Sequence, residues 1–282
     1  MSVIIPTGAH IISFNGGLGN QMFEYAFFLA LKRIMPFRIY GFDISGSIGQ
    51  HYGYELDRIF KIDTTLQRKI YPKLRKLERH RLIRFEKCSE QNCWQYEKGL
   101  LQKRFSPTEY VGFWQTEKYF KCIENKVRQV FRFRTELLNE KTIALAKELS
   151  TNENSISLHI RRGDYVNIDN CQTYGQGYYL DALEYMQRRT GGKIIIFSDD
   201  IDWCRANLSM EDALYVDWNN GVDSWQDMYL MSLCKNNIIA NSSFSWWGAW
   251  LNENPNKIVI APKQWMKSDV GVDVIPKTWI RI

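Results

Sequence analysis

The chain repeatedly alternates a short apolar run, a small or polar loop and a stretch with helical periodicity, and this alternation limits its fold more than any other feature. Such an order is typical of parallel sheets whose strands are joined by helices. In the first half, strands are expected at His10–Phe14, Arg38–Phe42 and Tyr110–Phe113, and a helix over Gln21–Met35 that a proline ends. The first half is therefore predicted to be α/β, although less regular than the second.

The second half reads as a doubly wound sheet, because its strands are near-continuous apolar runs that suit burial on both faces. Its strands are expected at Ser155–Ile160, Lys193–Phe197, Ala213–Val216, Asn237–Ala240 and Lys257–Ile260. Its helices are expected at Gly177–Arg189, Asp223–Lys235 and Phe244–Asn252. A helical stretch followed by a polar run at 141–154 marks the boundary, which predicts one domain at 1–145 and another at 146–282.

Length and composition suit two globular domains. At about 150 residues per domain, 282 residues predict two, and 45% hydrophobic with 24% charged residues exclude a disordered or collagen-like chain. The longest apolar stretch, Tyr25–Leu31, is far shorter than the roughly 18 to 20 residues that cross a bilayer. Because the first residues also lack the features of a signal peptide, we expect a cytoplasmic protein.

The six cysteines are scattered, without a C-x-x-C pair or a neighbouring histidine cluster. This spacing predicts reduced thiols that mostly take part in packing, and neither a zinc site nor a disulfide framework. They are Cys88, Cys93, Cys122, Cys171, Cys204 and Cys234.

Basic residues are concentrated in one segment. Residues 67–104 hold twelve Lys and Arg against four Glu, whereas the whole chain has a net charge of +6. Within it, the apolar and cationic residues of 71–85 alternate, which predicts a helical insertion with a basic face. Such a face suits anionic lipid headgroups or another anionic partner, and the alternative is a solvated helix. No nucleic-acid-binding motif accompanies the charge, so nucleic acid is not expected as a partner.

Open α/β sheets bind ligands at the carboxyl ends of their strands, so the residues that follow the strands are the candidates for chemistry. After the first strand, Gly16, Gly17 and Gly19 lead into a helix that starts near Asn20. A helix N-terminus offers backbone N–H groups and a positive dipole end to an anion such as phosphate. The loop is neither a dinucleotide fingerprint nor a P-loop, and a tight structural turn is the alternative.

A second candidate is the run His159-Ile160-Arg161-Arg162-Gly163-Asp164, at the end of a buried strand. Arginine suits a diphosphate because its planar fork donates two parallel hydrogen bonds and keeps its charge. Two arginines at this position need an anion or a carboxylate to meet them. Asp164 is the internal alternative to a bound anion.

A third candidate is the acidic run Ser198-Asp199-Asp200-Ile201-Asp202, which follows another buried strand. Its carboxylates suit hydrogen bonds from a ribose or from the N–H edge of guanine. The Asp200-x-Asp202 spacing also resembles the D-x-D of manganese-dependent sugar transferases, since carboxylates bind hard cations. The structural alternative is a helix N-cap with an acidic first turn.

The fourth candidate is the run from Asn241 through Ser242, Ser243, Phe244 and Ser245 to three tryptophans. Its hydroxyls are expected to cap a helix, and they also suit a phosphate at the helix N-terminus. The tryptophans are expected mostly to pack, and some of the chain's aromatic rings suit a platform for a sugar. Together, the four loops predict a nucleotide-diphosphate ligand.

The segments GGLGNQMFEYA, HIRRGDYV, FSDD and NSSFSWWGAWL, in this order, resemble glycosyltransferase family 11, the α-1,2-fucosyltransferases. The resemblance covers about residues 11–265, although about 45–108 carries no motif of the family. It implies a GT-B fold, with two Rossmann-like domains facing a central cleft, an acceptor-side domain at 1–145 with the basic insertion at about 67–104, and a GDP-sugar-binding domain at 146–282.

The activity that the resemblance implies is inverting transfer of L-fucose from GDP-β-L-fucose to the 2-hydroxyl of a galactose-type residue. The GDP-sugar is then a co-substrate, and neither a cofactor nor a metal is expected. Arg161 would clamp the β-phosphate, and Asn20 would lie at the reaction centre. Asp164 is a candidate base, although it could only hold an arginine while the departing phosphate takes the proton.

The same resemblance assigns the remaining site residues to substrate binding. His159 would lie near the nucleotide, and Asp199 would accept hydrogen bonds from guanine. The full substrate-binding set is Gly17, Gly19, His159, Arg162, Ser198, Asp199, Ser242, Ser243, Phe244 and Ser245.

Two other functions stay open at this point. One is a transferase that uses another GDP-deoxyhexose or forms another linkage, and the other is a non-catalytic glycan-binding protein. The expected partners are GDP-fucose and a galactose-containing oligosaccharide or a lipid-linked glycan. Peripheral contact of the basic segment with anionic lipid at the inner face of the plasma membrane is a further expectation.

Overall fold

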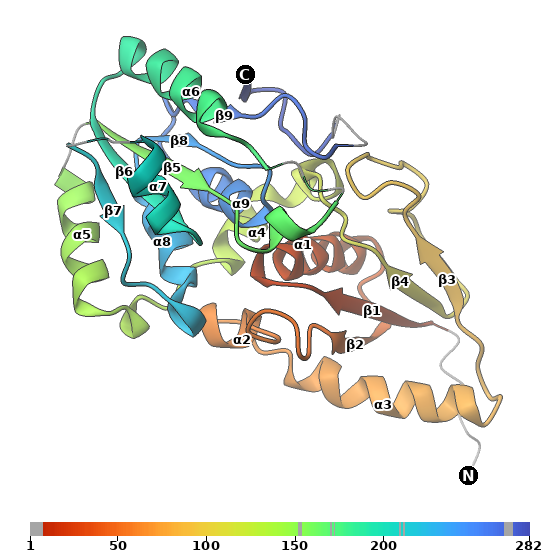
Figure 1. Ribbon diagram of the computed structural model, residues 1–282. Coiled ribbons are helices and arrows are strands. Elements are labelled where there is room, and N and C mark those ends of the chain that lie inside the picture. Colours follow the sequence, from red (N-terminus) through yellow and green to blue (C-terminus); the bar gives the residue numbers. More distant parts are fainter. Residues whose placement is uncertain are drawn as a thin grey trace. The chain divides into compact units, whose positions relative to one another are not determined.

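The computed structural model describes residues 8–151, 154–169, 171, 173–208, 210, 212–267 and 273–282 (Figure 1). The chain forms two compact units, Met1–Arg134 (unit 1) and Thr135–Ile282 (unit 2). Helix α5 (Glu140–Thr151) belongs wholly to unit 2, whereas the division expected from the sequence lies inside this helix. Each unit is described by itself, and the cleft expected between them stays a prediction.

Unit 1 contains a parallel sheet with the strand order β2-β1-β4-β3. The three strands predicted here are confirmed to within a few residues. The fourth, β3, was not predicted, because it is four residues long and buries only Cys88. The bounds are β1 Ala9–Asn15, β2 Ile39–Gly46, β3 Glu86–Ser89 and β4 Thr108–Val111.

Two helices account for most of the cover on this sheet. The predicted helix after β1 is confirmed as α1 (Leu18–Ile34), and the basic segment begins with α3 (Thr65–Arg79). The apolar side chains of α3 pack with Ala9, Ile11 and Ile83, so this helix covers the sheet. Shorter helices are α2 (Leu56–Ile59) and α4 (Glu124–Val130).

Unit 2 contains a second parallel sheet, with the strand order β10-β9-β8-β5-β6-β7. The five strands predicted for this half are confirmed within one or two residues at most ends, and the two-residue β10 was not predicted. The doubly wound arrangement is also confirmed, because the chain starts in the middle of the sheet and extends it in both directions. The bounds are β5 Ser155–Ile160, β6 Lys193–Ser198, β7 Leu214–Val216, β8 Asn236–Ile238, β9 Val259–Ala261 and β10 Ile280–Arg281.

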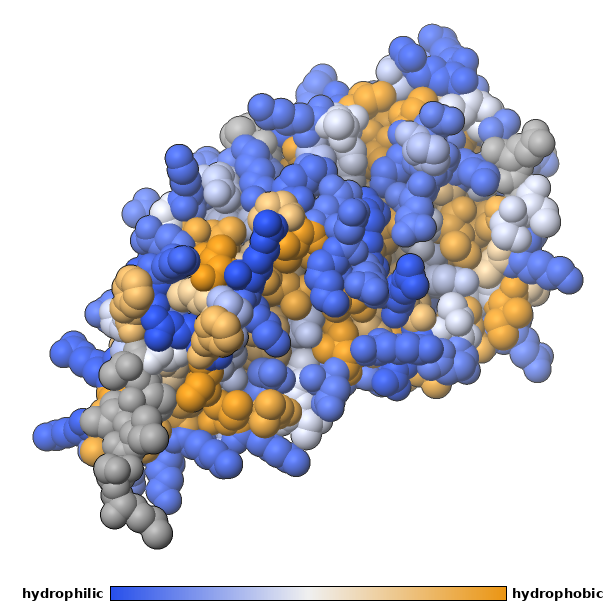
Figure 2. All heavy atoms as spheres, turned by 180° about the vertical axis from the view of Figure 1, so that it is seen from behind, coloured by the Kyte–Doolittle hydropathy of each residue, from blue (hydrophilic) through white to orange (hydrophobic). Residues whose placement is uncertain are grey.

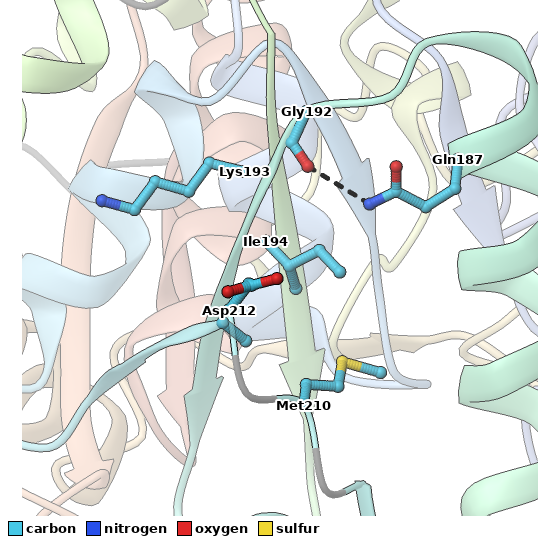
Figure 3. A pocket seen from close by; sticks show the side chains of 7 residues that line it. Gln187, Gly192, Lys193, Ile194, Met210 and Asp212 are labelled. Atoms are coloured by element: carbon cyan, nitrogen blue, oxygen red, sulfur yellow. Dashed lines mark hydrogen bonds between the residues drawn. The ribbon is translucent and has the colours of Figure 1, made fainter.

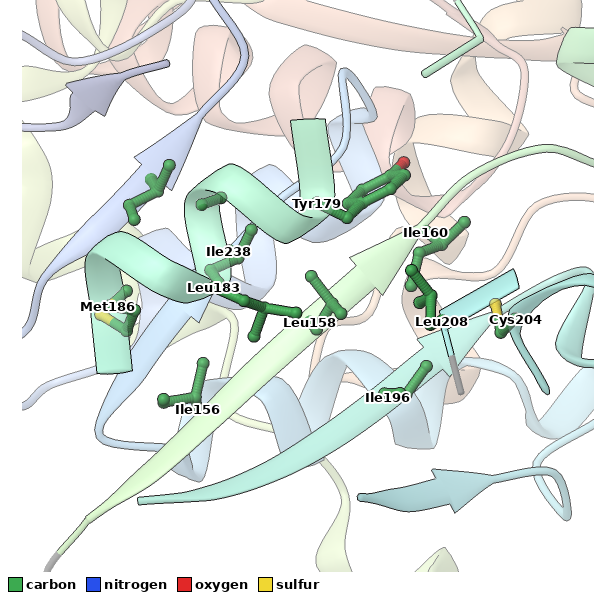
Figure 4. Packing of buried hydrophobic residues seen from close by; sticks show 12 residues of the cluster. Ile156, Leu158, Ile160, Tyr179, Leu183, Met186, Ile196, Cys204, Leu208 and Ile238 are labelled. Carbon is green, nitrogen blue, oxygen red and sulfur yellow. The ribbon is translucent and has the colours of Figure 1, made fainter. Parts of the chain in front are cut away.

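Helices cover both faces of this sheet. On one face, Ile156, Leu158 and Ile160 of β5 pack against α6 (Gln176–Arg189) and α7 (Ile201–Leu208) (Figure 4). On the other, side chains of β6 pack against α5 and α8 (Trp225–Leu233). Alternate residues of β6 therefore serve two separate cores, which is why its run from Ile194 to Phe197 is apolar throughout, whereas β5 places Ser155, Ser157 and His159 between its apolar residues. The last helix is α9 (Ser243–Leu251).

The thiols and the helix lengths bear on two further expectations. All six cysteines are free, and Cys88, Cys171, Cys204 and Cys234 are buried. Among the described residues, none of the helices combines the length and the hydropathy needed to cross a bilayer. Hydrophobic side chains reach the surface at several places (Figure 2).

Candidate functional site

The turn after β5 holds an arginine whose two terminal nitrogens each meet a different carboxylate. Arg161 Nη2 lies 2.7 Å from Asp164 Oδ1, and Arg161 Nη1 lies 3.0 Å from Asp199 Oδ2. The guanidinium also lies over the ring of Tyr165, 5.3 Å from its centroid. β5 lies beside β6 with Ile160 opposite Ser198, so Asp199 is brought opposite Arg161 by the strand register. The sheet therefore assembles this cluster from two loops distant in sequence.

The second arginine is fixed by a different set of contacts. Arg162 Nε lies 3.2 Å from Asp200 Oδ2, and its guanidinium carbon lies 4.1 Å from the ring centroid of Trp203. A cation held over an indole face and paired with a carboxylate has little freedom to move. Arg162 therefore anchors the start of α7 to the end of β5.

Asp199 links the two arginines. Its Oδ2 is in the pair with Arg161, and its Oδ1 accepts a hydrogen bond from the Arg162 backbone N–H at 2.9 Å. A Cβ atom added to Gly163 would lie 2.4 Å from Asp199 Oδ2, closer than any real contact allows. Alanine at this position would therefore displace the Asp199 carboxylate.

The cluster contains two guanidinium groups and three carboxylates, those of Asp164, Asp199 and Asp200. The arginine charges are balanced within the protein by these carboxylates. Asp164 is the more accessible of the two partners of Arg161, with 43% of its side chain exposed against 26% for Asp199. It also lies on a short 3₁₀ turn, Asp164–Asn167, whereas Asp199 is held by a second hydrogen bond.

His159 lies behind the cluster in the interior. The pKa of His159 is lowered to about 3, chiefly by burial; the negative charge of Asp199 opposes this shift, and the positive charge of Arg161 adds to it. The imidazole is therefore neutral at physiological pH. Its ring lies 5.9 Å from the ring of Phe244 at the start of α9, and its Nδ1 is one of the buried polar atoms without a hydrogen-bond partner in the described part of the chain.

The start of α9 confirms the expected helix cap. Ser242 Oγ accepts a hydrogen bond from the Phe244 backbone N–H at 3.3 Å. Ser245 is fully buried and donates to the carbonyls of Ala240 and Ser242. Ser243, in the first turn, is partly exposed. Of these hydroxyls, that of Ser245 is turned into the backbone and is not available to a ligand in this conformation.

The acidic run after β6 has the cap geometry of the structural alternative. Ser198 Oγ accepts from the Asp200 backbone N–H at 2.9 Å, and Asp200 Oδ1 accepts from the Trp203 N–H at 3.1 Å. The carboxylate of Asp200 is thus shared between a helix cap and Arg162. The described residues contain no group of three or more side chains arranged to hold a metal ion.

The glycine loop of unit 1 is held by side chains of α1 and of the segment after β4. Gly16 has φ +69°, a conformation that favours glycine. Gln115 Nε2 donates to Asn20 Oδ1 at 2.8 Å, which fixes the orientation of the Asn20 amide. Gln21 Nε2 donates to the carbonyls of Gly16 and Gly53 at 2.9 and 2.8 Å. The loop is therefore rigidly supported.

Two buried carboxyl groups support the same end of the unit 1 sheet. Glu24 accepts hydrogen bonds from the Asn15 N–H, and burial raises the pKa of Glu24 well above its ordinary value. Glu90, after β3, accepts from the N–H groups of Phe113 and Trp114. Burial raises the pKa of Glu90 to about 7, although those N–H groups lower it. These contacts shape the turn that presents Gln115.

A cavity of about 340 Å³ lies at the amino ends of strands in the unit 2 sheet (Figure 3). Its lining includes the first residues of β6, so it is at the amino end of the strands, away from Arg161. Lys193 pairs with Glu148 at 2.7 Å. The cavity is lined by Gln187, Gly192, Lys193, Ile194, Met210, Asp212 and Ala213. None of the residues predicted for the site is among them.

The structure thus brings together, within unit 2, the predicted residues Arg161, Arg162, Asp164 and Asp199. The predicted loop of Gly17, Gly19 and Asn20 lies in unit 1. The sequence did not identify Trp203 and Gln115, which contact Arg162 and Asn20. Neither stands in a recognisable motif, and their roles depend on the turn of α7 and on the pairing of β1 with β4.

The chain resembles known proteins along nearly its whole length. Residues 6–282 match the family described as Glycosyl transferase family 11. The Alpha-1,2-colitosyltransferase of Escherichia coli is 34% identical and covers 95% of this chain and 96% of its own length. The O-antigen biosynthesis glycosyltransferase WbnK of Escherichia coli is 30% identical, over 95% of this chain and 98% of its own.

Among solved structures, the fucosyltransferase NodZ from Bradyrhizobium has a TM-score of 0.53 and 13% identity, over 85% of this chain and 91% of NodZ. At this identity the likeness shows the fold alone. With the two parallel α/β sheets it confirms the expected GT-B fold class. The family match and the two relatives over 95% of the chain confirm the expected family: the chain belongs to glycosyl transferase family 11 and is a glycosyltransferase.

Proposed function

We propose that this enzyme transfers L-fucose, with inversion, from GDP-β-L-fucose to the 2-hydroxyl of a galactose-type residue in a glycan. The observation that carries the proposal is the Arg161 fork at the carboxyl end of β5, held between Asp164 and Asp199. Ligands of open α/β sheets bind at this edge. The relative named as an α-1,2-colitosyltransferase supports the linkage.

In the proposed reaction, the oxygen of the acceptor 2-hydroxyl forms a bond to C1 of fucose while the bond from C1 to the β-phosphate oxygen breaks. GDP leaves with additional negative charge, and Arg161 stabilises that charge by hydrogen bonds that strengthen in the transition state. Arg162 holds the start of α7 in place. The acceptor proton passes to a base or to the departing phosphate.

Asp164 has two possible parts in this scheme, and its geometry favours one. Its pairing with Arg161 at 2.7 Å fits an internal counter-ion, and no observed contact of Asp164 identifies it as a base. We therefore assign it the role of a counter-ion that the diphosphate replaces. The departing phosphate then takes the proton. Asp199, with both oxygens engaged, orients Arg161, and any hydrogen bond that it accepts from guanine uses its remaining lone pairs.

The substrate contacts proposed for the other loops follow from their position. His159 is neutral, so its ring can pack or hydrogen-bond beside the nucleotide without adding charge. Ser242 and Ser243 lie at the N-terminus of α9, where an anion is favoured. In unit 1, the Asn20 amide is oriented by Gln115 and is proposed to contact the reacting groups from the loop of Gly17 and Gly19.

The second candidate donor is the GDP-linked deoxyhexose colitose, because the relative that is 34% identical is named as an α-1,2-colitosyltransferase. Colitose lacks the 3-hydroxyl that fucose carries. An active site that hydrogen-bonds this hydroxyl would reject colitose strongly, whereas a site without such a contact would use both sugars. The relative rates with the two donors therefore separate the candidates.

The experiment that tests the proposal is incubation with GDP-fucose, or with GDP-colitose, and a panel of β-galactosides, with NMR of the product to identify the linkage. A fucosyl-α-1,2-galactose product is expected, and transfer to another hydroxyl would contradict the proposal. Activity should survive excess EDTA, since Asp200 is engaged by Arg162 rather than available to a cation. Substitution of Arg161 by alanine should lower the rate about 100-fold or more.

The acceptor is proposed to be a galactose-containing oligosaccharide, either free or lipid-linked. The name of WbnK, an O-antigen biosynthesis glycosyltransferase, supports an acceptor of the O-antigen kind. Assays with lipid-linked and water-soluble acceptors of the same sugar sequence would separate the two. A purely glycan-binding role would show as glycan binding without stabilisation by GDP.

A further inference from the structure

The amino ends of the strands in unit 1 form a surface that the transfer reaction does not use. Three segments come together there: 36–39 before β2, 79–86 between α3 and β3, and 103–105 before β4. Ile39 is paired with Ala9, and Thr108 is paired with both His10 and Glu86. The strand pairing therefore places the three segments side by side, and we call this surface the amino edge.

The amino edge is strongly cationic. Its three segments carry six Lys and Arg and a single carboxylate, that of Glu86. The pKa of the buried His10 is lowered to about 4, chiefly by burial, and the positive charges of Arg38 and Arg104 contribute to the shift. By contrast, Arg68 and Arg75, earlier in the basic segment, pair with carboxylates. The exposed cations are Arg79, Arg81, Arg84 and Lys103, whereas Arg38 and Arg104 are partly buried.

Large apolar side chains are exposed among these cations. Phe37 is 97% exposed and Phe105 is 76% exposed, and Ile39 and Leu82 are also on the surface. The Arg38 guanidinium lies over the Phe105 ring at 5.6 Å, so cation and ring are in direct contact. Hydrophobic and strongly hydrophilic spheres are intermingled at the lower left of Figure 2. Exposed rings grouped with cations differ from the scattered apolar residues of an ordinary surface.

Arg81 adds an independent observation, because its backbone conformation favours glycine. Arg81 has φ +60° and follows α3, where its N–H donates to Glu78 O and the next N–H donates to Leu77 O. This is the Schellman arrangement, in which glycine at the position of Arg81 is most stable. The chain therefore keeps a cation at the amino edge at a place where the fold favours a residue without a side chain.

We propose that the amino edge binds the surface of an anionic phospholipid bilayer. Its cations would meet lipid phosphates, and Phe37 and Phe105 would enter the boundary between headgroups and acyl chains. The basic contact expected from the sequence is thereby assigned to the strand ends and the end of α3, rather than to the long face of that helix. The loop of Asn20 lies at the opposite ends of the same strands, so membrane contact leaves it uncovered.

The test is co-sedimentation of the full chain with phosphatidylcholine vesicles that contain or lack phosphatidylglycerol, at low and high salt. Binding is expected only to the anionic vesicles, and salt should weaken it because exposed charges are screened. Arg81→Ala together with Arg84→Ala should weaken binding about 25-fold, at about five-fold per charge. Phe37→Ser together with Phe105→Ser should remove the part of the binding that resists salt.

Arg81→Gly separates the effect on binding from any effect on folding. It should keep or raise the melting temperature while it lowers vesicle binding about five-fold. Vesicle binding that is unchanged in a well-folded Arg81→Gly protein contradicts the assignment. The matched control is Ile143→Ser with Lys147→Glu on the exposed face of α5, which changes an apolar and a basic residue elsewhere and should leave binding unchanged.

A third set of variants distinguishes the amino edge from the outward face of α3. Lys69→Ala, Lys73→Ala and Lys76→Ala together remove exposed charges from that face. If they abolish binding while the amino-edge variants do not, the proposal is wrong. The proposal is also wrong if the protein does not co-sediment with anionic vesicles and the Phe37 and Phe105 substitutions convert a dimer to a monomer. In that case the amino edge would contact a second copy of the chain. GDP binding, measured in parallel, is unaffected in either case.

Discussion

Substitution of Gly163 by alanine tests how Asp199 holds the Arg161 fork. The added Cβ would lie 2.4 Å from Asp199 Oδ2, whereas ordinary contacts begin at 3.4 Å, so the carboxylate must move by about 1 Å. The distance from Arg161 Nη1 to Asp199 Oδ2, 3.0 Å in the structure, then approaches the limit of an ion pair. The hydrogen bond from the Arg162 N–H is stretched as well.

The expected effect is a loss of GDP affinity. A hydrogen bond to a charged group contributes about 1.5 to 3 kcal/mol. If the misplaced Arg161 guanidinium loses one such hydrogen bond to GDP, the affinity for GDP falls about 10- to 150-fold. Isothermal titration of the Gly163→Ala protein with GDP at fixed salt measures this directly. Gly177→Ala is the matched control, because no atom lies within 4 Å of the added Cβ, and its affinity should equal that of the wild type.

Two results would refute the reasoning. The first is a folded Gly163→Ala protein whose affinity for GDP is within about threefold of the wild type, below the tenfold that 1.4 kcal/mol represents. The second concerns Asp199→Asn, which removes the charge but keeps the shape. If Gly163→Ala acts through Asp199, the protein that combines Gly163→Ala with Asp199→Asn should bind GDP little more weakly than either single variant. Additive losses of GDP affinity would show that the alanine acts elsewhere.

Three further predictions concern single side chains. Asp164→Asn should tighten GDP binding, because it frees one nitrogen of Arg161; a lower kcat with unchanged GDP affinity, in titrations and rate measurements, would instead identify Asp164 as the base. Gln115→Ala should lower kcat more than it raises the KM for GDP-fucose, since it releases the Asn20 amide; equal changes in both would contradict a role at the reaction centre. The pKa of Glu90 is raised from 4.5 to about 7, so its contribution to stability is present below about pH 4.5 and is lost as the pH rises to about 7. Relative to Glu90→Gln, the free energy of unfolding of the wild type, measured with urea, should fall by about 3 kcal/mol over that range, at 1.36 kcal/mol per pKa unit. Parallel pH profiles of the two proteins would show that the pKa of Glu90 is not raised in the folded protein.

The strands could be predicted from the sequence where burial is complete. In β6 alternate residues serve different cores, so its apolar run is unbroken, whereas β5 alternates apolar residues with Ser155, Ser157 and His159 although all six of its residues are buried. The edge strand β3 escaped prediction because only Cys88 is buried and its other residues are polar or charged. Its place in the sheet is set by pairing with β4, which local sequence does not encode.

The site could be predicted as a set of loops but not as a set of pairs. The motif around Arg161 identifies a cationic turn, yet its partner Asp199 follows from the register that places Ile160 opposite Ser198. The contact of Arg162 with Trp203 depends on the direction of the first turn of α7. Such contacts join loops distant in sequence, and a single sequence gives no measure of the spacing between them.

The pairing of Arg161 has a consequence for how the site is kept when no nucleotide is bound. A guanidinium with only 23% of its side chain exposed is costly without an opposite charge, so an empty site needs an internal counter-ion. A counter-ion as well held as Asp199 would compete too strongly with a diphosphate. Asp164, which is more exposed and lies on a short turn three residues away, can be exchanged at lower cost. In the proposed site, one fixed and one exchangeable carboxylate would keep the same arginine oriented and would still let it receive the phosphate.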